Sequence, residues 1–492
     1  MQRYIKSLSL LVAAITLGSC GKDFLERQPQ GRFTTETYPG GQFEQYIYGM
    51  YATLRDYGVH VMPFIAISSI RSDDADKGST PADGADQKAM DEFTLAPSNG
   101  LVKAYYTALY SGVNKCNQVL KQVSIASGNV SEEDKRLSIA EAKMLRGYFY
   151  FNLVRAFGGV PKIDSLITDE ARFNVPRASK EAIYALIEED LTYAAANLPL
   201  KWDPKYIGRV TKGAAQGLLA KVYLYEKKYA QAIGMTTAVI NSGQYNLQSS
   251  YSYLYSEEGE NCSESIFEVQ ALYTISYTGY GCQYAQVQGV RGAGTFDLGW
   301  GFNVPSATLV AAYEAGDPRR DATILYAGET TPYGETLPTN LPNPRYNQKV
   351  YTNPKVRLQT NSRFGQWMNI RLLHYSDVLL MHAEAANEQG QTDEALAKLE
   401  MVRARARGKS DILPAITERD KNKLTDLIRQ ERRIELAMEH ERFYDIVRWG
   451  IAKKALQADG KNNFVEGKHE LLPIPQDEID KAQGILIQNP NY

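Results

Sequence analysis

A cluster of oxygen-bearing side chains lies in residues 71–80, RSDDADKGST. Clustered carboxylates are the ligands that Ca²⁺ prefers, so Asp73, Asp74 and Asp76 are candidates for a calcium site. Counted from Asp74, however, the twelfth position is an alanine and not the bidentate Glu of an EF-hand loop. Two other interpretations stay open: a solvated polar loop, or a site where Arg71, Asp73 and Asp74 hydrogen-bond hydroxyl groups of a ligand.

Few residues are available for nucleophilic or transition-metal chemistry, because the chain holds only 5 His and 4 Cys. No HExxH, GxSxG or GxxxxGK[ST] motif occurs, and no Gly-x-Gly unit extends to GxGxxG. His374 and His382 lie eight residues apart with no third ligand in view, which favours core packing or solvent exposure. A carboxylate pair of the glycosidase type is defined by distance in space. The sequence therefore gives no positive sign of an enzyme.

Composition is that of a globular protein with an excess of tyrosine. The 492 residues include 55 Lys plus Arg against 57 Asp plus Glu, and 43% are hydrophobic. The near-balance of charge argues against nucleic acid as a partner, since its binders usually show a basic excess. Tyrosines outnumber phenylalanines by 33 to 15, and eight of them fall between residues 245 and 284.

Residues 1–19 have the features of a secretory signal. Two basic residues precede an apolar run from Leu8 to Leu17, which is shorter than the roughly 20 residues of a transmembrane helix. The ending LGSC is similar to a bacterial lipobox, so we expect cleavage to leave an acylated Cys20; an ordinary secretory signal is the alternative. Each buried methylene of an acyl chain adds about 0.8 kcal/mol of membrane affinity. The expected mature protein is lipid-anchored, with its body outside the bilayer.

Three cysteines remain after Cys20: Cys116, Cys262 and Cys282. In an exported protein a Cys262–Cys282 disulfide, with Cys116 left as a buried thiol, is one outcome. Unpaired thiols are the other, and no Cys/His spacing indicates zinc.

Helical periodicity and an internal repeat dominate the chain. Helices are expected at 101–127, from a capping box at Ser131 to about Phe157, and at 179–197. AKVYLYEKKYAQAI (220–233) aligns without gaps to AEAANEQGQTDEAL (383–396), and each segment reads as helix, tight turn, helix with a small alanine at the crossing. This pattern looks like a tetratricopeptide repeat, whose helix pairs must stack to bury their faces. The segments 132–157 with 179–197, and 423–440, could supply further units.

The residue pattern of the sequence changes at about Gly243. Seven glycines lie between Gly279 and Gly301, and seven prolines lie between residues 300 and 366. No sustained helical period survives there, apart from about Ser306 to Glu314. A structureless stretch this long is improbable in a compact domain, so we expect loops and short strands. Loops on a rigid scaffold are where binding usually occurs.

Seven stretches together resemble the SusD/RagB family of Bacteroidetes outer-membrane nutrient-binding lipoproteins. In chain order they are CGKDFLERQP, RGYFYFNLVRAFGGVP, RVTKGAAQGLLAKVYLYEKKYAQAI, GWGFNVPSATLVAAYEAGDPR, RLLHYSDVLLMHAEAANEQG, ERRIELAMEHERFYDIVRWG and ELLPIPQDEI…LIQNPNY. The resemblance implies a mainly α fold, a right-handed superhelix of four tetratricopeptide-like helix pairs with an irregular, loop-rich, short-strand face. Within a body of residues 20–492, the scaffold is expected mainly at 42–242 and 371–456, and the irregular ligand-face subdomain at about 243–370.

The resemblance also implies a function. Such proteins capture oligosaccharides, or in some members peptides, at the cell surface and pass them to a SusC-like TonB-dependent transporter in the outer membrane. They are non-catalytic and need no cofactor, apart from the calcium considered above. Lys22 and Asp23 after the cysteine are similar to the family's surface-export signal. A tetratricopeptide interaction scaffold without a small ligand, and an unrecognised glycosidase, are the alternatives.

With a sugar as the expected ligand, the excess of tyrosine has a functional interpretation. A ring can stack on the apolar face of a sugar while its hydroxyl bonds the rim, at little cost in rotamer entropy. In the loop-like TISYTGYG we favour Tyr277 and Tyr280 as ligand contacts. Trp300, in the family's GWG motif, and Trp367 are further candidates, with packing as the alternative for both. Trp202, between two prolines, is expected to anchor a surface loop.

Overall fold

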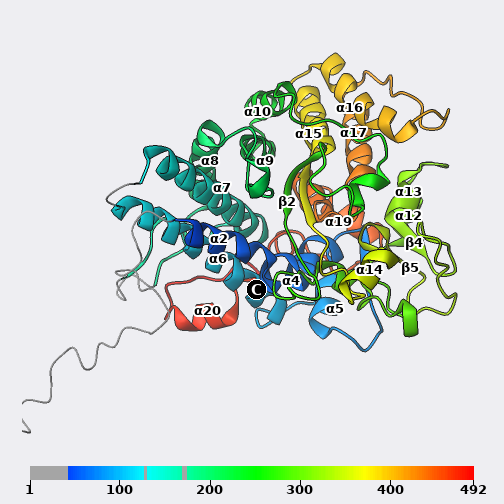
Figure 1. The fold of residues 1–492 in the computed structure, drawn as a ribbon, viewed down its shortest axis with the longest axis horizontal. Helices are drawn as coiled ribbons and strands as arrows, with labels where there is room; N and C mark the ends of the chain where they lie inside the picture. Colours follow the sequence, from blue (N-terminus) through cyan, green and yellow to red (C-terminus); the bar gives the residue numbers. More distant parts are fainter. Residues whose placement is uncertain (1–42, 127–129, 169–173) are drawn as a thin grey trace, which may run out of the picture. The chain divides into compact units, whose positions relative to one another are not determined.

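The computed structural model describes residues 43–126, 130–168 and 174–492 (Figure 1). The signal sequence, Cys20, Lys22 and Asp23 lie outside the described residues, and their predicted roles stay predictions. Among the residues that the structure describes, no helix combines the length and apolar character needed to cross a membrane.

The longer helices pack in the order in which they occur along the chain. They are α2 (Glu44–Ala52), α6 (Gly100–Ile125), α7 (Glu132–Phe157), α8 (Lys180–Asn197), α9 (Lys212–Tyr225), α10 (Tyr229–Asn241), α15 (Tyr375–Glu388), α16 (Thr392–Arg407) and α17 (Lys421–Glu435). Helix α6 packs on α7, α7 on α8, α8 on α9, α9 on α10 and α10 on α15, and α15 also contacts α16 and α17 (Figure 1). The predicted mainly α fold of stacked helix pairs is confirmed.

Local signals set the ends of these helices. The backbone N–H of Asp134 donates to the Ser131 hydroxyl at 3.0 Å, which caps α7. Helix α7 ends at Gly158, whose φ of 72° is readily adopted only by glycine. Ser179 caps α8 in the same way, accepting from the Ala182 N–H.

The two halves of the internal repeat are the pairs α9–α10 and α15–α16. Ala232 and Ala395, the small residues expected at the helix crossing, are both fully buried. The turns also agree in backbone conformation, because Lys227 and its aligned partner Gly390 both have positive φ, 58° and 73°. Two segments 163 positions apart in sequence therefore adopt the same helix-turn-helix geometry.

Within the described ranges of the chain, six short strands form three antiparallel ribbons. They are β1 (Ala75–Gly78), β2 (Ser265–Val269), β3 (Phe302–Pro305), β4 (Ile324–Tyr326), β5 (Arg345–Asn347) and β6 (Ile370–His374). β1 pairs with β3, with Asp76 opposite Val304; β2 pairs with β6, and β4 with β5. The strands of the irregular region are thus tied to the N-terminal part through β1 and to the start of α15 through β6.

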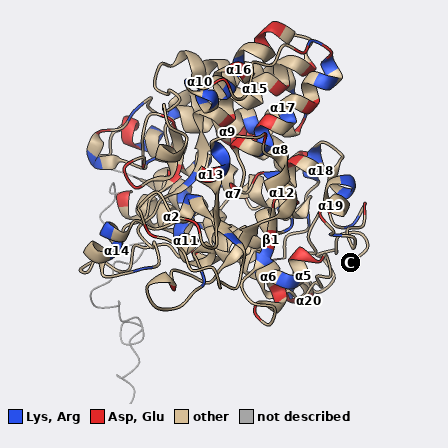
Figure 2. Cartoon of the chain, turned by 90° about the vertical axis from the view of Figure 1, so that its right-hand side faces the viewer, with Lys and Arg blue, Asp and Glu red and all other residues tan. Residues whose placement is uncertain are grey.

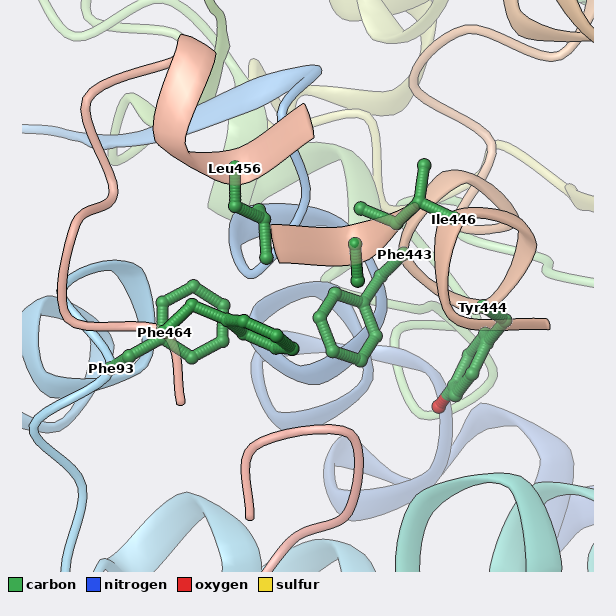
Figure 3. Packing of buried hydrophobic residues seen from close by; sticks show 7 residues of the cluster. Phe93, Phe443, Tyr444, Ile446, Leu456 and Phe464 are labelled. Atoms are coloured by element: carbon green, nitrogen blue, oxygen red, sulfur yellow. The ribbon is translucent and has the colours of Figure 1, made fainter. Parts of the chain in front are cut away.

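Short helices fill the remainder. They are η2 (Thr53–Arg55), α3 (Tyr57–His60), α4 (Met62–Ile65), η3 (Ala66–Ile70), α5 (Ala85–Asp91), η5 (Pro204–Tyr206), η6 (Ser252–Tyr255), α11 (Tyr284–Gln288), η7 (Gly294–Phe296), α12 (Ala307–Ala312), α13 (Arg319–Thr323), η8 (Gln348–Val350), α14 (Pro354–Thr360), α18 (Arg442–Arg448), α19 (Ala452–Ala458) and α20 (Gln476–Lys481). Around α18 and α19, buried aromatic and aliphatic residues form a core cluster (Figure 3). Its phenylalanines are Phe93, Phe443 and Phe464.

Ionised side chains also form part of the interior. Figure 2 shows basic and acidic residues interspersed along α16 and α17. Beneath that surface the fully buried Arg432 donates to Asp445 at 2.7 Å and also bonds Asp377. Asp377 in turn lies 2.8 Å from the Lys221 amine. Buried charges of this kind persist only where each has a partner.

Candidate ligand-binding surface

A small hairpin follows β2 and carries the two favoured tyrosines. The Leu272 N–H donates to the Tyr280 carbonyl at 3.0 Å, and the Thr274 N–H donates to the Tyr277 carbonyl at 3.0 Å. The Tyr277 N–H bonds the Thr274 hydroxyl as well as its carbonyl. We call residues 272–281 the hairpin. Its backbone is fixed by these bonds, so its side chains are presented from a defined support.

The hairpin exposes apolar surface to solvent. Exposed fractions are 51% for Leu272, 69% for Ile275, 58% for Tyr277 and 53% for Tyr280. The rings of Tyr277 and Tyr280 have centroids 6.5 Å apart and planes inclined at 43°. This spacing is within the range of interacting aromatic pairs. The tyrosine pair therefore forms an open aromatic platform, as contact with a ligand requires.

Neutral amide groups lie at the base of the hairpin. The Cys282 N–H donates to the Gln366 carbonyl at 2.8 Å. The side-chain amides of Gln283 and Gln366 both donate to the Gln286 side-chain oxygen, at 3.2 and 3.3 Å. Gln283 and Gln366 remain partly exposed. Such groups can offer hydrogen bonds to uncharged hydroxyls beside an aromatic platform.

The GWG motif is linked to this base through α11. The backbone N–H of Trp300 donates to the Gln286 backbone carbonyl at 2.8 Å. A Cβ added at Gly299 would lie 2.4 Å from that same carbonyl oxygen, so glycine permits the close approach. Trp300 is partly buried. The structure thus ties the Trp300 backbone to Gln286, whose side chain lies at the base of the hairpin. Contact between the Trp300 ring and a ligand stays a prediction.

Trp367 does not belong to this surface. Only 7% of its area is exposed, and its indole N–H donates to a Glu257 carboxylate oxygen at 3.2 Å. The segment leads directly into β6 and the core helix α15. The prediction of a ligand contact at Trp367 is wrong, because packing takes its ring and Glu257 takes its polar atom.

The predicted hydroxyl-binding group Arg71, Asp73 and Asp74 is also corrected. Arg71 is fully buried, 4.0 Å from the ring centroid of Phe443, and donates to a backbone carbonyl. Both carboxylate oxygens of Asp73 accept from Arg442 at 2.8 Å. Asp74 accepts from the Nε of Arg433 at 2.7 Å. Each of these three side chains is bonded to another segment of the protein, so the predicted hydroxyl-binding group is occupied within the fold.

The same contacts argue against calcium at Asp73, Asp74 and Asp76. A calcium site needs several ionised oxygens free to bind the ion. Here guanidinium groups supply the positive charge at Asp73 and Asp74. Burial raises the pKa of Asp74 and of Asp76, which disfavours the ionised form. This loop is an ion-pair cluster that joins β1 to α17 and α18.

Within the described part of the chain, Glu264, His374 and Glu435 lie close enough together to hold a metal ion. Arg405 pairs with both glutamates, however. The His374 ring nitrogens bond Glu439 and Ser376, each at 2.7 Å. Each of the three residues is thus already bonded within the buried ionic network. Of the two environments left open for His374, core packing or solvent, the structure has core packing.

Of the two outcomes left open for Cys262 and Cys282, the structure has unpaired thiols: both cysteines are free, as is the buried Cys116. Burial raises the pKa of the Cys282 thiol to about 11, so it is uncharged near neutral pH. Cys282 lies beside Gln366, whereas Cys262 lies in a cleft near β2.

Sequence reasoning missed the apolar members of the hairpin. Leu272 and Ile275 alternate with polar residues and could equally have faced a core. The available signal was their position in a stretch rich in Ser, Thr and Gly, where isolated apolar residues tend to be exposed. The amides of Gln283 and Gln366 carried no signal, since their proximity depends on contacts between distant segments.

Comparison with known proteins places the chain and its fold in a family. The SusD family profile matches residues 264–492, which include the hairpin, and a second profile, described as starch-binding associating with outer membrane, matches residues 23–224. SusD-like protein P2 of Formosa agariphila is 28% identical over 100% of both chains.

Solved structures agree along nearly the whole chain. A laminarin-binding SusD-like protein is 30% identical, with a TM-score of 0.78 over 92% of this chain and 99% of the other. A SusD homologue from Bacteroides thetaiotaomicron is 25% identical, with a TM-score of 0.80 over 93% and 98%. With its stacked helix pairs and irregular face, this chain belongs to the SusD family.

Proposed function

We propose that the protein captures oligosaccharides without cleaving them. The observation that carries this proposal is the open pair Tyr277 and Tyr280, held on a hydrogen-bonded hairpin with neutral amides at its base. Aromatic faces suit the C–H faces of sugar rings, and amides suit their hydroxyls. The laminarin-binding relative supports this reading, as does surface glycan-binding protein A from Bacteroides fluxus, which is 26% identical with a TM-score of 0.76 over 92% of this chain.

The proposal includes a location and a partner. We place the protein on the cell surface, anchored in the outer membrane through acylated Cys20, where it delivers glycans to a SusC-like TonB-dependent transporter. The lipobox-like sequence before Cys20 supports the anchor, and the family profile's description supports the membrane. Purification of the native membrane complex should recover a large transporter subunit. A Cys20→Ser variant should be released from the membrane; recovery of the wild-type protein without a transporter would remove the partner from the proposal.

Isothermal titration of the purified protein with laminarin and maltoheptaose tests glycan capture. Tyr280→Ala should lower affinity about tenfold, the effect typical of a central aromatic contact. Trp300→Ala tests whether the neighbouring indole shares the ligand. The matched control is Tyr253→Ala: Tyr253 is 39% exposed and lies in η6, outside the hairpin and its base.

Three results would replace this function with another. Binding of peptides but of no glycan would favour peptide capture. Binding of neither, with retention of a protein partner, would favour an interaction scaffold. Release of shorter sugars from a bound glycan would make the protein a glycosidase.

A further inference from the structure

A second hollow lies apart from the hairpin. A cleft of about 500 Å³ opens between the loop joining α8 to α9 and the segments around the start of β2. Trp202 and Tyr206 line one wall, and Gln244 and Asn261 line the other. Trp300 and the hairpin residues do not line the cleft. The volume falls within the ~300–1,000 Å³ typical of small-molecule sites.

The aromatic wall is fixed before any ligand arrives. The Trp202 indole N–H donates to the Val210 carbonyl at 2.8 Å, and its ring meets that of Tyr206 edge-on at 6.2 Å. The Arg209 guanidinium lies 4.2 Å from the Trp202 ring centroid. That guanidinium is itself held by the buried Glu141, at 2.8 Å from Nε. A wall that is already ordered costs little entropy when it binds.

The opposite wall offers uncharged hydrogen-bonding groups. The side-chain amides of Asn261 and Gln270 bond each other at 2.9 and 3.0 Å, and the Ser263 hydroxyl accepts from Gln248 at 2.7 Å. Gly208 lets the two walls approach: its φ is +88°, and an added Cβ would lie 2.1 Å from the Gln270 Cγ. Another residue at position 208 would be strained at this φ and would have to displace the Gln270 side chain or the loop.

The charged groups of Arg209 and Glu268, held in the cleft walls, already have hydrogen-bond partners. Arg209 pairs with Glu141, and Glu268 accepts from the Asn261 N–H at 3.1 Å and from the Asn369 amide at 2.9 Å. The exposed Lys201 and Asp203 bear opposite charges. Besides these two exposed charges, the cleft offers a ligand an aromatic and aliphatic wall facing amides and hydroxyls, the chemistry that complements an uncharged sugar ring.

We propose that this cleft is a second carbohydrate-binding site, for an uncharged oligosaccharide. The inference rests on the proposed function, since it gives the same ligand class two places to bind. Strand β2 joins them: Glu268 lines the cleft and Leu272 opens the hairpin, about 13 Å apart in extended chain. A long glycan that reaches both sites gains affinity by effective concentration, whereas a short one occupies them independently.

The test removes each site separately. The cleft variant is Trp202→Ala/Tyr206→Ala, the hairpin variant is Tyr277→Ala/Tyr280→Ala, and the control is Tyr253→Ala. Wild type, the variants and their combination are titrated with laminarin and maltoheptaose, and with the trisaccharides of the glycan that binds. We expect the cleft variant to bind the long glycan with about tenfold lower affinity. The hairpin variant should keep residual glycan binding, and the combined variant should lose this residual binding. Gln244→Ala/Ser263→Ala, on two exposed residues of the other wall, repeats the test should the cleft variant not fold.

Hydrogen exchange locates the ligand directly. Bound glycan should protect backbone amides in residues 200–211 and 261–265 of the wild type, and still do so in the hairpin variant. If glycan protects the hairpin alone and cleft variants bind like wild type, the second site is overturned while the proposed function stands. If no glycan in the panel binds the wild-type protein, both fail. Protection of residues 200–211 by a peptide and not by glycan would also overturn the carbohydrate assignment.

Discussion

Side-chain type and environment are mismatched in two regions, and in opposite ways. Between α15, α17 and α18, ionised side chains such as Arg432 and Asp377 are buried and bonded to one another. On the hairpin, apolar side chains such as Ile275 and Tyr277 are exposed. Burying charge costs free energy unless it is paired, and isolated exposed apolar residues are common on protein surfaces. The first mismatch is resolved within the fold; the second is not, and it leaves an apolar surface open to a ligand.

Breaking the buried network should have the largest effect. Arg432→Ala leaves Asp377 and Asp445 charged and buried without their shared partner, and we expect a loss of about 3–5 kcal/mol in the free energy of unfolding. Urea denaturation followed by circular dichroism measures it. The matched control is Arg419→Ala, because Arg419 and Asp393 form an exposed pair and such pairs contribute up to about 1 kcal/mol. Equal losses for the two variants would show that burial does not set the importance of these pairs.

His60 adds a pH-dependent test in the same interior. Its ring bonds the Leu54 carbonyl and the Tyr148 hydroxyl, also lies near His440, and is fully buried, which lowers its pKa to about 4. The neutral ring is favoured only in the folded state, so stability should fall as pH drops from 6.5, the unfolded value, to 4. The expected loss across this window is roughly 3 kcal/mol.

The matched variant is His60→Asn, which cannot gain a proton. The wild-type free energy of unfolding minus that of the variant should decrease steadily from pH 7 to pH 4, while contributions from His440 and the acidic groups largely cancel. A constant difference across this range would mean that His60 does not titrate in the folded protein.

A smaller effect should separate the two turns of the internal repeat. Lys227 and Gly390 occupy equivalent left-handed positions, which cost a non-glycine residue roughly 1 kcal/mol. Lys227→Gly should stabilise the protein by less than about 1 kcal/mol, because glycine also raises the entropy of the unfolded chain. Gly390→Ala should destabilise it by about 1 kcal/mol, and the cost is conformational because nothing lies within 4 Å of an added Cβ. Changes of the same sign would contradict the repeat alignment.

Structural features that depend on residues close together in the chain could be predicted from the sequence. The cap at Ser131 and the aligned turns were predictable because their signals lie within a few residues. Asp73 was misassigned because its partner Arg442 is 369 residues away, and Trp367 because Glu257 is 110 residues away. No spacing in the sequence indicates which distant charge or ring a side chain will meet. The exposure of Tyr277 and Tyr280 was predictable from the surrounding turn residues, and their role in binding stays a prediction.

The smallest expected change completes the comparison. Tyr277→Ala/Tyr280→Ala removes two exposed rings, so the free energy of unfolding should stay within about 0.5 kcal/mol of wild type. Tyr150→Ala is the control: that ring is fully buried in α7 and its hydroxyl accepts from the Ile163 N–H at 2.6 Å, so about 3–5 kcal/mol should be lost.

Denaturation with and without a bound glycan then separates structure from function. Glycan stabilises the wild type by mass action, and the double variant should lose most of that gain while its intrinsic stability is kept. Tyr150→Ala should show the reverse, lower intrinsic stability with the glycan-induced gain retained. If the double variant were destabilised as much as Tyr150→Ala, the hairpin rings would be part of the core, and the exposed surface would need no ligand to explain it.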